Sequence, residues 1–248
     1  AINLVENKDL NYFLNEVKRT DYFWSRFDAL PDFRGKTVLD FGCGHGALTL
    51  HAARYKPKKI IGIDLEKNYI DFANKNLSKN YGQYKNIVEF KLVDINKWDP
   101  EEKFDIIISK ETFEHVLDLD TVLNSMYKLL ANEGKVYSGF GPLYNFFNGD
   151  HGRVFPIIPW FHLLLPQSFL INRINKKNKN KISSITELGL NMYSLKEYMS
   201  MFNNSKFKID YLKKNMSNNK ILFIFKILSK FKILEEYFTF NIFTILRK

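Results

Sequence analysis

The sequence predicts an α/β domain built around a mostly parallel sheet, with helices as crossover connections. Over the first 140 residues, short apolar runs typical of strands alternate with longer amphipathic runs typical of helices. A second observation is the stretch 37–46, TVLDFGCGHG, in which an apolar run ends at a carboxylate and passes into alternating glycines. The chain has 248 residues, 45% of them hydrophobic, which is enough for one domain with a substantial core.

The first element is an amphipathic helix expected over residues 8–29, where Leu10, Phe13, Leu14 and Val17 recur at helical spacing. Strands are then predicted at 37–41, 59–64, 88–93, 104–109 and 135–140, with helices between them at 47–56, 67–80 and 118–131. Because such crossovers are right-handed, the carboxyl ends of these strands meet at one edge of the sheet. Ligands of open parallel sheets bind at that edge.

The alternation stops after residue 140, and we expect residues 142–192 to form an inserted cap over the ligand edge. Four of the seven prolines lie here, and residues 154–172 contain no Asp, Glu, Lys or Arg. A membrane-spanning helix is disfavoured, because each of the three prolines in this uncharged run removes a helical hydrogen bond that hydrocarbon cannot replace. Peripheral contact of 154–171 with a membrane fits better, and the Asn- and Lys-rich stretch 173–181 is predicted to be a loop.

The last segment is predicted to complete the sheet. Ser194 and Glu197 have the spacing of a capping box and begin a helix that extends to Phe202. Strands are predicted at 206–214 and 237–247. Between them, residues 220–234 form an apolar run interrupted by lysines, which suits a helix packed on the sheet or an amphipathic segment at a membrane interface.

Charge is distributed unevenly. The formal net charge is +10, and residues 151–248 contain 17 Lys and Arg against 5 Asp and Glu, whereas residues 1–150 contain 20 against 22. A basic C-terminal part would suit an anionic substrate, an anionic membrane surface or nucleic acid. A Lys-rich solvated face is an equally simple interpretation.

Composition also restricts the chemistry. The single cysteine excludes an internal disulfide framework and a Cys-rich zinc site, and no His, Asp and Glu cluster has convincing metal spacing, so no metal is predicted. The first residues lack the pattern of a secretory signal. We therefore expect a cytoplasmic protein, with membrane association as a further option.

The glycine loop predicts a nucleotide-binding turn. Gly42, Gly44 and Gly46 can adopt positive φ, which lets backbone N–H groups approach a ligand beside the N-terminus of the next helix. The loop alone would also fit a dinucleotide or a tight turn without ligand. Cys43 within the loop is interpreted as a small residue that fits a crowded turn, in preference to a nucleophile.

Acids at three successive strand ends decide between these ligands. Asp64 lies 18 residues after Gly46, close to the ~20-residue offset of a ribose-binding carboxylate. Asp94 ends the third strand and would suit an adenine amino group, and Asp40 would hold a cationic amino group or brace the loop. Together they favour a ligand with adenosine, a positive charge and no phosphate. S-adenosyl-L-methionine has that chemistry, and a dinucleotide does not.

Four stretches in order, VLDFGCGHG, GID, VDI and ETFEHVLD, resemble the successive motifs of class I S-adenosylmethionine-dependent methyltransferases. The last is most similar to the small-molecule branch that includes the ubiquinone-biosynthesis type. The resemblance covers about residues 30–141. It implies a Rossmann-like seven-stranded sheet of order 3-2-1-4-5-7-6, with strand 7 antiparallel and helices on both faces.

The resemblance also implies the residues that hold S-adenosyl-L-methionine and its product S-adenosyl-L-homocysteine. They are Asp40, Gly42, Cys43, Gly44, Gly46, Asp64, Leu65, Asp94, Ile95, Lys110 and Glu111. Lys110 and Glu111 would line the methionine end. The chain is then expected to be a single methyltransferase domain over 1–248, with a helical cap (1–30), a cofactor-binding core (31–141), an apolar and basic insert for the acceptor (142–192) and final helices and strands (193–248).

The acceptor side is less defined. A hydroxyl acceptor must lose a proton, and histidine is the usual base. His151, in the turn that follows the fifth strand, is the first candidate and His115 the second, although either could be only structural. Tyr144, Arg153 and Trp160 of the insert are the predicted substrate-binding residues.

The leading hypothesis is an enzyme that methylates an oxygen of a small or medium-sized metabolite, such as a sugar, a glycan precursor or a lipid-linked acceptor. Transfer to nitrogen or carbon is the variant of this hypothesis. RNA methylation through the basic C-terminal segment is the alternative, and it is less favoured because no appended RNA-binding motif is recognisable. A non-catalytic S-adenosylmethionine-binding module is the third hypothesis.

Overall fold

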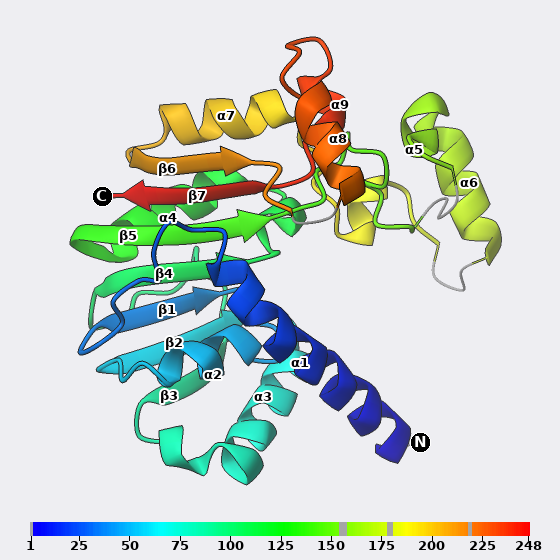
Figure 1. The fold of residues 1–248 in the computed structure, drawn as a ribbon. Helices are drawn as coiled ribbons and strands as arrows, with labels where there is room; N and C mark the ends of the chain where they lie inside the picture. Colours follow the sequence, from blue (N-terminus) through cyan, green and yellow to red (C-terminus); the bar gives the residue numbers. More distant parts are fainter. Residues whose placement is uncertain (1, 154–157, 178–180, 218–219) are drawn as a thin grey trace.

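The computed structural model describes residues 2–153, 158–177, 181–217 and 220–248 (Figure 1). Its sheet consists of β1 (Thr37–Phe41), β2 (Lys59–Asp64), β3 (Val88–Leu92), β4 (Phe104–Lys110), β5 (Leu130–Phe140), β6 (Lys208–Lys214) and β7 (Ile242–Arg247). Within the described ranges the order is β3-β2-β1-β4-β5-β7-β6. The first five strands are parallel, and β7 is antiparallel to both β5 and β6. The predicted topology is therefore confirmed.

Helices cover both faces because neighbouring strand residues point in opposite directions. Val38 packs into a core with residues of α1 (Ile2–Trp24), α2 (Ala47–Ala53) and α3 (Lys67–Asn80). Leu39 packs into the opposite core with residues of α4 (Leu119–Leu129) and α7 (Leu195–Asn204). A strand buried on both faces reads as a continuous apolar run, which is why these strands were predictable.

Helix ends differ from the sequence predictions by a few residues. The first helix ends at Trp24, five residues early, and α2 ends at Ala53. The side chain of Asp118 accepts the N–H of Thr121 at 3.0 Å and so caps α4. Three 3-10 turns, η1 (Gly82–Tyr84), η2 (Phe113–His115) and η3 (Ile185–Leu188), complete the connections in the described part.

The insert after β5 projects from the carboxyl edge of the sheet and has a small core of its own (Figure 1). It contains α5 (Phe161–Leu164) and α6 (Gln167–Lys177). The prediction of a loop over 173–181 is therefore wrong as far as Lys177, and 178–180 lie outside the described residues. Leu170 and Ile174, one helical turn apart, are both buried in the insert core, so a pattern that looked polar carries a buried stripe.

The uncharged stretch 154–172 is only partly described, because residues 154–157 lie outside the described ranges. From 158 onward it contains a turn, α5 and the first half of α6. Among the helices that the structure describes, none has the length and apolar character needed to cross a membrane.

The C-terminal part begins with the predicted capping box. The Ser194 side chain accepts the N–H of Glu197, and the Glu197 carboxylate accepts the N–H of Ser194 at 2.7 Å. Helix α8 (Lys220–Leu228) then packs through Phe225 against Phe146 and Phe147 of the insert, not on a face of the sheet. The predicted start of the last strand at 237 is wrong, because α9 (Glu235–Phe238) precedes β7 and Thr239 donates its hydroxyl hydrogen back to the Glu235 carbonyl at 2.7 Å.

Candidate active site

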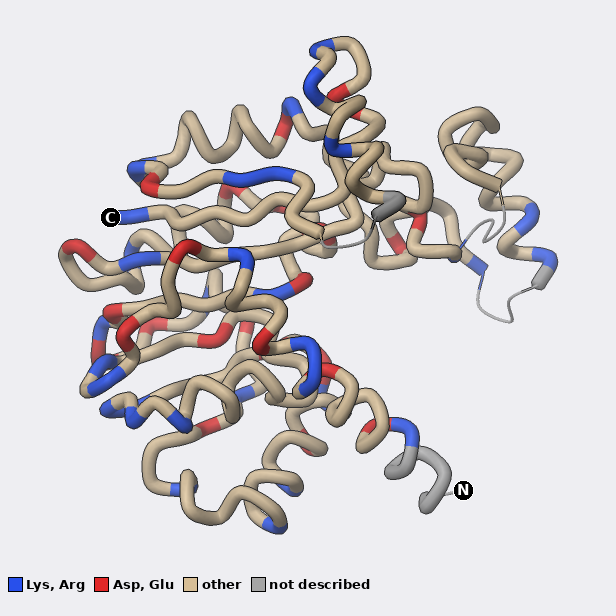
Figure 2. Tube along the Cα trace, viewed as in Figure 1, with Lys and Arg blue, Asp and Glu red and all other residues tan. Residues whose placement is uncertain are grey.

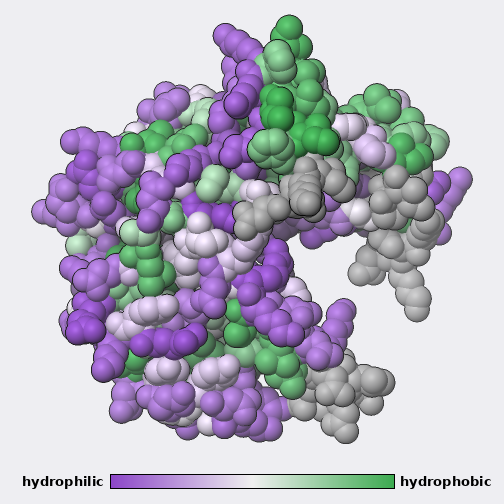
Figure 3. Space-filling view, viewed as in Figure 1, coloured by the Kyte–Doolittle hydropathy of each residue, from purple (hydrophilic) through white to green (hydrophobic). Residues whose placement is uncertain are grey.

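A cavity of about 800 Å³ opens at the carboxyl edge of the sheet. Its wall is formed by the loops after β1 to β4, by side chains of α1, and by Arg153 and Gly189 of the insert. Figure 3 shows the molecule hollowed between the N-terminal helix and the insert. Of the eleven residues predicted to hold the cofactor, ten line this cavity: Asp40, Gly42, Cys43, Gly44, Asp64, Leu65, Asp94, Ile95, Lys110 and Glu111.

The three glycines of the loop have different roles. All three have positive φ. A Cβ at Gly42 would lie 2.4 Å from the Thr112 side chain, and one at Gly46 would lie 2.5 Å from the Phe90 ring. Gly46 does not line the cavity and instead lies at the N-terminal end of α2. A Cβ at Gly44 would meet nothing within 4 Å. Of the two loop glycines that line the cavity, Gly44 is therefore the one with open space beside it.

Asp64 connects the glycine loop to the end of β2. Its two carboxylate oxygens accept the backbone N–H groups of Gly44 and Glu66, each at 2.9 Å. A carboxylate has about four lone-pair positions, so each oxygen can accept another hydrogen bond from a ligand. Beside it, Leu65 lines the cavity with a side chain that is 71% exposed, which provides an apolar surface next to a strong acceptor.

Asp40 is buried beneath the loop. Its Oδ2 accepts the Thr49 hydroxyl hydrogen at 2.6 Å, and burial raises its pKa to about 7. Of the two predicted roles, the contact with Thr49 supports the one in which Asp40 braces the loop. Burial also raises the pKa of the Cys43 thiol, which keeps it protonated and agrees with its interpretation as a small packing residue.

Asp94 and Ile95 follow β3 on the same side of the cavity. Asp94 accepts the N–H of Asn96 at 3.0 Å, which shapes the turn after the strand. Ile95 is buried in the core below it. The arrangement leaves the second carboxylate oxygen of Asp94 with an ion pair to the exposed Lys97 at 3.6 Å.

Helix α1 supplies a wall that the sequence did not reveal. Tyr12 and Glu16 line the cavity, and the amphipathic pattern of residues 8–29 gives no signal for which polar side chains face a ligand. The buried ring of His45 lies between Tyr12 and Tyr69, with ring centroids 4.8 and 4.6 Å away. Burial raises the pKa of Tyr12 to about 12.

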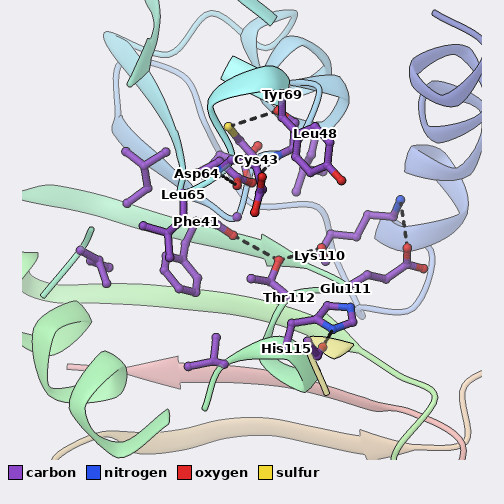
Figure 4. Close-up of a pocket in the computed structure, with 18 of the residues that line it drawn as sticks. Phe41, Cys43, Leu48, Asp64, Leu65, Tyr69, Lys110, Glu111, Thr112 and His115 are labelled. Carbon is purple, nitrogen blue, oxygen red and sulfur yellow. Dashed lines mark hydrogen bonds and ion pairs between the residues drawn. The ribbon is translucent and has the colours of Figure 1, made fainter. Parts of the chain in front are cut away.

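Four charged side chains meet where β4 ends. Lys110 forms an ion pair with Glu16, and Arg19 forms ion pairs with Glu16 at 2.8 Å and with Glu111 at 2.5 Å. Glu111 has a φ of 52°, an uncommon backbone conformation for a residue with a side chain. Burial raises its pKa, and Lys110 and Arg19 oppose the shift. Figure 4 shows Lys110 and Glu111 beside the N-terminal helix, across the cavity from Asp64 and Leu65.

The two predicted bases lie side by side. The ring centroids of His115 and His151 are 5.4 Å apart, and His115, unlike His151, lines the cavity. Nδ1 of His115 donates to the Gly189 carbonyl at 2.5 Å, and Nε2 of His151 donates to the Pro142 carbonyl at 3.3 Å. Burial lowers the pKa of His115, and burial together with His115 lowers the pKa of His151 to about 4. Both rings are therefore neutral at pH 7.

The three predicted substrate-binding residues do not lie at one site. Arg153 lines the cavity, whereas Tyr144 and Trp160 do not. Tyr144 is buried in the insert core, and its carbonyl accepts the Nε2 hydrogen of His162 at 2.7 Å. Trp160 packs against Phe147, Phe225 and Phe238.

Asn191 holds the turn that carries His115 against the end of the insert. Its side-chain amide donates to the carbonyls of Phe113 at 2.7 Å and Val116 at 3.0 Å, and its oxygen accepts the Tyr198 hydroxyl hydrogen at 3.0 Å. These hydrogen bonds join the turn after β4 to a segment more than 70 residues later in the chain. No sequence pattern singles out this asparagine.

Comparison with known proteins gives three findings. Residues 32–140 match the family described as a methyltransferase domain. Phosphoethanolamine N-methyltransferase 1 of Zea mays is 38% identical over 103 residues, which are 41% of this chain and 20% of that protein. Malonyl-[acyl-carrier protein] O-methyltransferase of Acetivibrio thermocellus is 32% identical over 106 residues, 42% of this chain and 35% of that protein. The match thus covers a fifth to a third of these relatives.

Solved structures are similar over nearly the whole chain. The S-adenosylmethionine-dependent methyltransferase of Mesorhizobium loti has a TM-score of 0.61 at 13% identity, covering 93% of this chain and 97% of that one. Magnesium protoporphyrin IX methyltransferase of Synechocystis, solved with bound S-adenosylhomocysteine, has a TM-score of 0.57 at 14% identity, covering 95% and 84%. At these identities the likeness establishes the fold.

Proposed function

We propose that the chain is a class I S-adenosylmethionine-dependent methyltransferase that binds S-adenosyl-L-methionine at the carboxyl edge of its sheet and methylates a small molecule, because residues 32–140 match a methyltransferase domain and the sheet has the expected strand order. The observation that carries the proposal is the convergence of ten predicted cofactor residues on one cavity. The open space at Gly44 supports it, because a ligand can approach the backbone there.

The residues on each side of the cavity fit the parts of this cofactor. Asp64 offers free lone pairs for the ribose hydroxyls, and Leu65 and Ile95 offer apolar surface for the adenine. Glu16 and Glu111 lie at the other end, where the amino group of the methionine part needs acceptors. When bound, S-adenosylmethionine supplies an electrophilic methyl group. The protein's contribution is then to hold the acceptor in line and exclude water.

For the base we propose His115 in place of the first candidate, His151. His115 lines the cavity, and the hydrogen bond from Nδ1 to Gly189 leaves the Nε2 lone pair available. Its lowered pKa keeps this lone pair unprotonated at neutral pH. A neutral histidine at the cavity is what a hydroxyl acceptor requires, which supports oxygen as the acceptor atom.

We also propose that helix α8 makes peripheral contact with a membrane surface. Phe223, Ile224 and Ile227 of α8 are 61%, 57% and 45% exposed; Lys226 lies between them in the sequence, and Lys230 follows the helix. Figure 3 shows this apolar surface beside the insert. Exposed apolar side chains flanked by lysines suit an anionic bilayer surface.

Sedimentation with anionic vesicles tests this proposal. The double variant Phe223→Ser/Ile227→Ser should lose vesicle binding, and the control variant Ile209→Ser on β6 should retain it. Equal binding of both variants would contradict the membrane proposal.

Nucleic acid is less supported. Several C-terminal cations pair with acids: Lys213 with Asp28 at 2.7 Å, and Arg247 with Asp210 at 3.0 Å and Glu133 at 2.9 Å. Figure 2 shows basic and acidic segments interspersed along the strands. Paired cations contribute less to phosphate binding than free ones.

Calorimetry with S-adenosylhomocysteine and with NAD tests the ligand assignment. The proposal expects binding of S-adenosylhomocysteine and none of NAD, and the opposite result would refute it. Turnover of methyl-labelled S-adenosylmethionine with metabolite fractions then separates an enzyme from a binding module. Labelled product supports the enzyme, and binding without product in any fraction supports the module.

A further inference from the structure

A second cavity of about 320 Å³ adjoins the first. Both cavities are lined by Lys110 and Glu111, so the end of β4 forms a boundary that they share. The rest of the second cavity comes from α1 and the turn after it, from the end of β5, from α8 and the residues before it, and from the start of β7 and the residues before it. Its volume falls within the range of small-ligand sites.

Arg26 is the unusual residue of this cavity. It is only 5% exposed, its guanidinium lies 3.7 Å above the centroid of the Tyr22 ring, and it forms no ion pair with any residue that the structure describes. Arg19, in the same lining, has two carboxylate partners. Burial lowers the pKa of Arg26, and no neighbouring acid opposes the shift. A buried charge is normally paired, so this guanidinium lacks the counter-ion that its position demands.

The remainder of the lining is mostly apolar. Phe23, Phe140 and Phe243 contribute rings, and Met216 and Leu222 contribute aliphatic surface. At Gly139, a Cβ would lie 2.3 Å from the Phe243 ring, so glycine is required for this ring to stand where it does. As far as the described residues show, the cavity therefore combines an apolar body with one cation that has no ion pair.

We propose that this second cavity holds the methyl acceptor, and that the acceptor is an amphiphile whose carboxylate or phosphate binds Arg26. Its apolar part lies against Phe23, Phe140 and Phe243, and its reacting end passes Lys110 and Glu111 toward the first cavity. The inference rests on the proposed methyltransferase function. It also agrees with the pairing of Lys110 and Arg19 with carboxylates: the shared wall is close to neutral, so Arg26, the one lining cation without an ion pair among the described residues, decides where the anionic group lies.

The step that follows is a simple displacement. The acceptor atom forms a bond to the methyl carbon, the bond from that carbon to sulfur breaks with its electron pair going to sulfur, and the acceptor proton goes to Nε2 of His115. The products are the methylated acceptor and S-adenosylhomocysteine. No oxidant or further reactant is needed.

The test uses three probes that share one chain length: hexyl phosphate, hexanoate and hexanol. With S-adenosylhomocysteine present, calorimetry should detect binding of hexyl phosphate and hexanoate to the unmodified protein. The affinity of the protein for hexanol should be lower by about tenfold or more. Arg26→Gln should weaken the two anionic probes by a similar factor and leave hexanol unchanged, while Arg26→Lys should restore part of the loss. Equal binding of hexanol and hexyl phosphate, or unchanged anion binding in Arg26→Gln, would overturn the inference.

Two further arms separate the possible failures. Titration of S-adenosylhomocysteine alone tests the cofactor proposal and should be the same for the unmodified protein and Arg26→Gln. Comparison of soluble hexyl phosphate with phosphatidate vesicles tells whether the anionic group belongs to a free amphiphile or to a membrane lipid. Should Arg26→Gln fail to fold, the preference of the unmodified protein for hexyl phosphate over hexanol still decides the inference.

Discussion

The carboxylate of Asp64 accepts the N–H of Gly44 at 2.9 Å, across 20 residues of chain. The end of β2 thus fixes the loop that follows β1, and the same side chain faces the cavity. Loop geometry and ligand binding therefore depend on one residue.

Replacing Asp64 should affect both properties. Asp64→Ala removes the acceptor for two backbone N–H groups that solvent can partly reach, so we expect about 1–2 kcal/mol less unfolding free energy. Affinity for S-adenosylhomocysteine should fall by about tenfold or more. Urea unfolding and calorimetry measure the two effects. The control is Asp71→Ala, which breaks an exposed ion pair with Lys67 and should alter neither; full affinity in Asp64→Ala would contradict the assignment.

Gly42 and Gly44 offer a matched pair. Both have positive φ, so alanine is strained at either position by about 1 kcal/mol. Gly42→Ala also collides with Thr112, and Gly44→Ala meets open space. We expect the lower melting temperature in Gly42→Ala. Gly44→Val is strained further, because a β-branched side chain tolerates positive φ poorly, and it should lose cofactor binding, because the added atoms occupy the ligand's space. Tight binding by Gly44→Val would show that the ligand does not approach this loop.

The two histidines predict a kinetic difference. His115→Ala should lower kcat by about 10²- to 10⁴-fold with little change in cofactor affinity. His151→Ala should have a smaller effect, because His151 does not line the cavity. Since the pKa of His115 is lowered by burial, activity should be level near neutral pH and decline only in acid, when Nε2 becomes protonated. A larger loss in His151→Ala would return the assignment to that residue.

Glu114 predicts a pH dependence of stability. It is buried, one oxygen accepts the Gly141 N–H at 3.1 Å, the other has no partner among the described residues, and burial raises its pKa to about 8. The folded state therefore binds a proton that the unfolded state releases near its ordinary pKa of about 4.3. The unfolding free energy should fall as pH rises from about 4.3 toward 8. Glu114→Gln should remove this part of the decline. Identical pH profiles for the two proteins in urea unfolding would contradict the prediction.

The sequence was sufficient for the parallel core and insufficient for what surrounds it. Strands such as β1 and β2 match their predicted bounds because they are buried on both faces and have an acid in the last or next-to-last position. The structure of the insert was harder to predict, because Leu170 and Ile174 are buried in a separate small core that the sequence pattern does not indicate. Tyr12 and Glu16 lie on α1 and Arg26 lies in the turn after it. The amphipathic pattern of this stretch reports burial but not which polar groups face a cavity. The missing information concerns the placement of α1, which long-range packing determines.

That placement has a consequence for the exchange of ligands. Glu16 and Arg19 pair with Lys110 and Glu111, so the first helix is held to the end of β4 by charges that a ligand could disturb from inside. Arg19 is also 55% exposed, and salt reaches it from outside. Ionic strength and ligand binding therefore act on the same set of charges, which join the first helix to the end of β4.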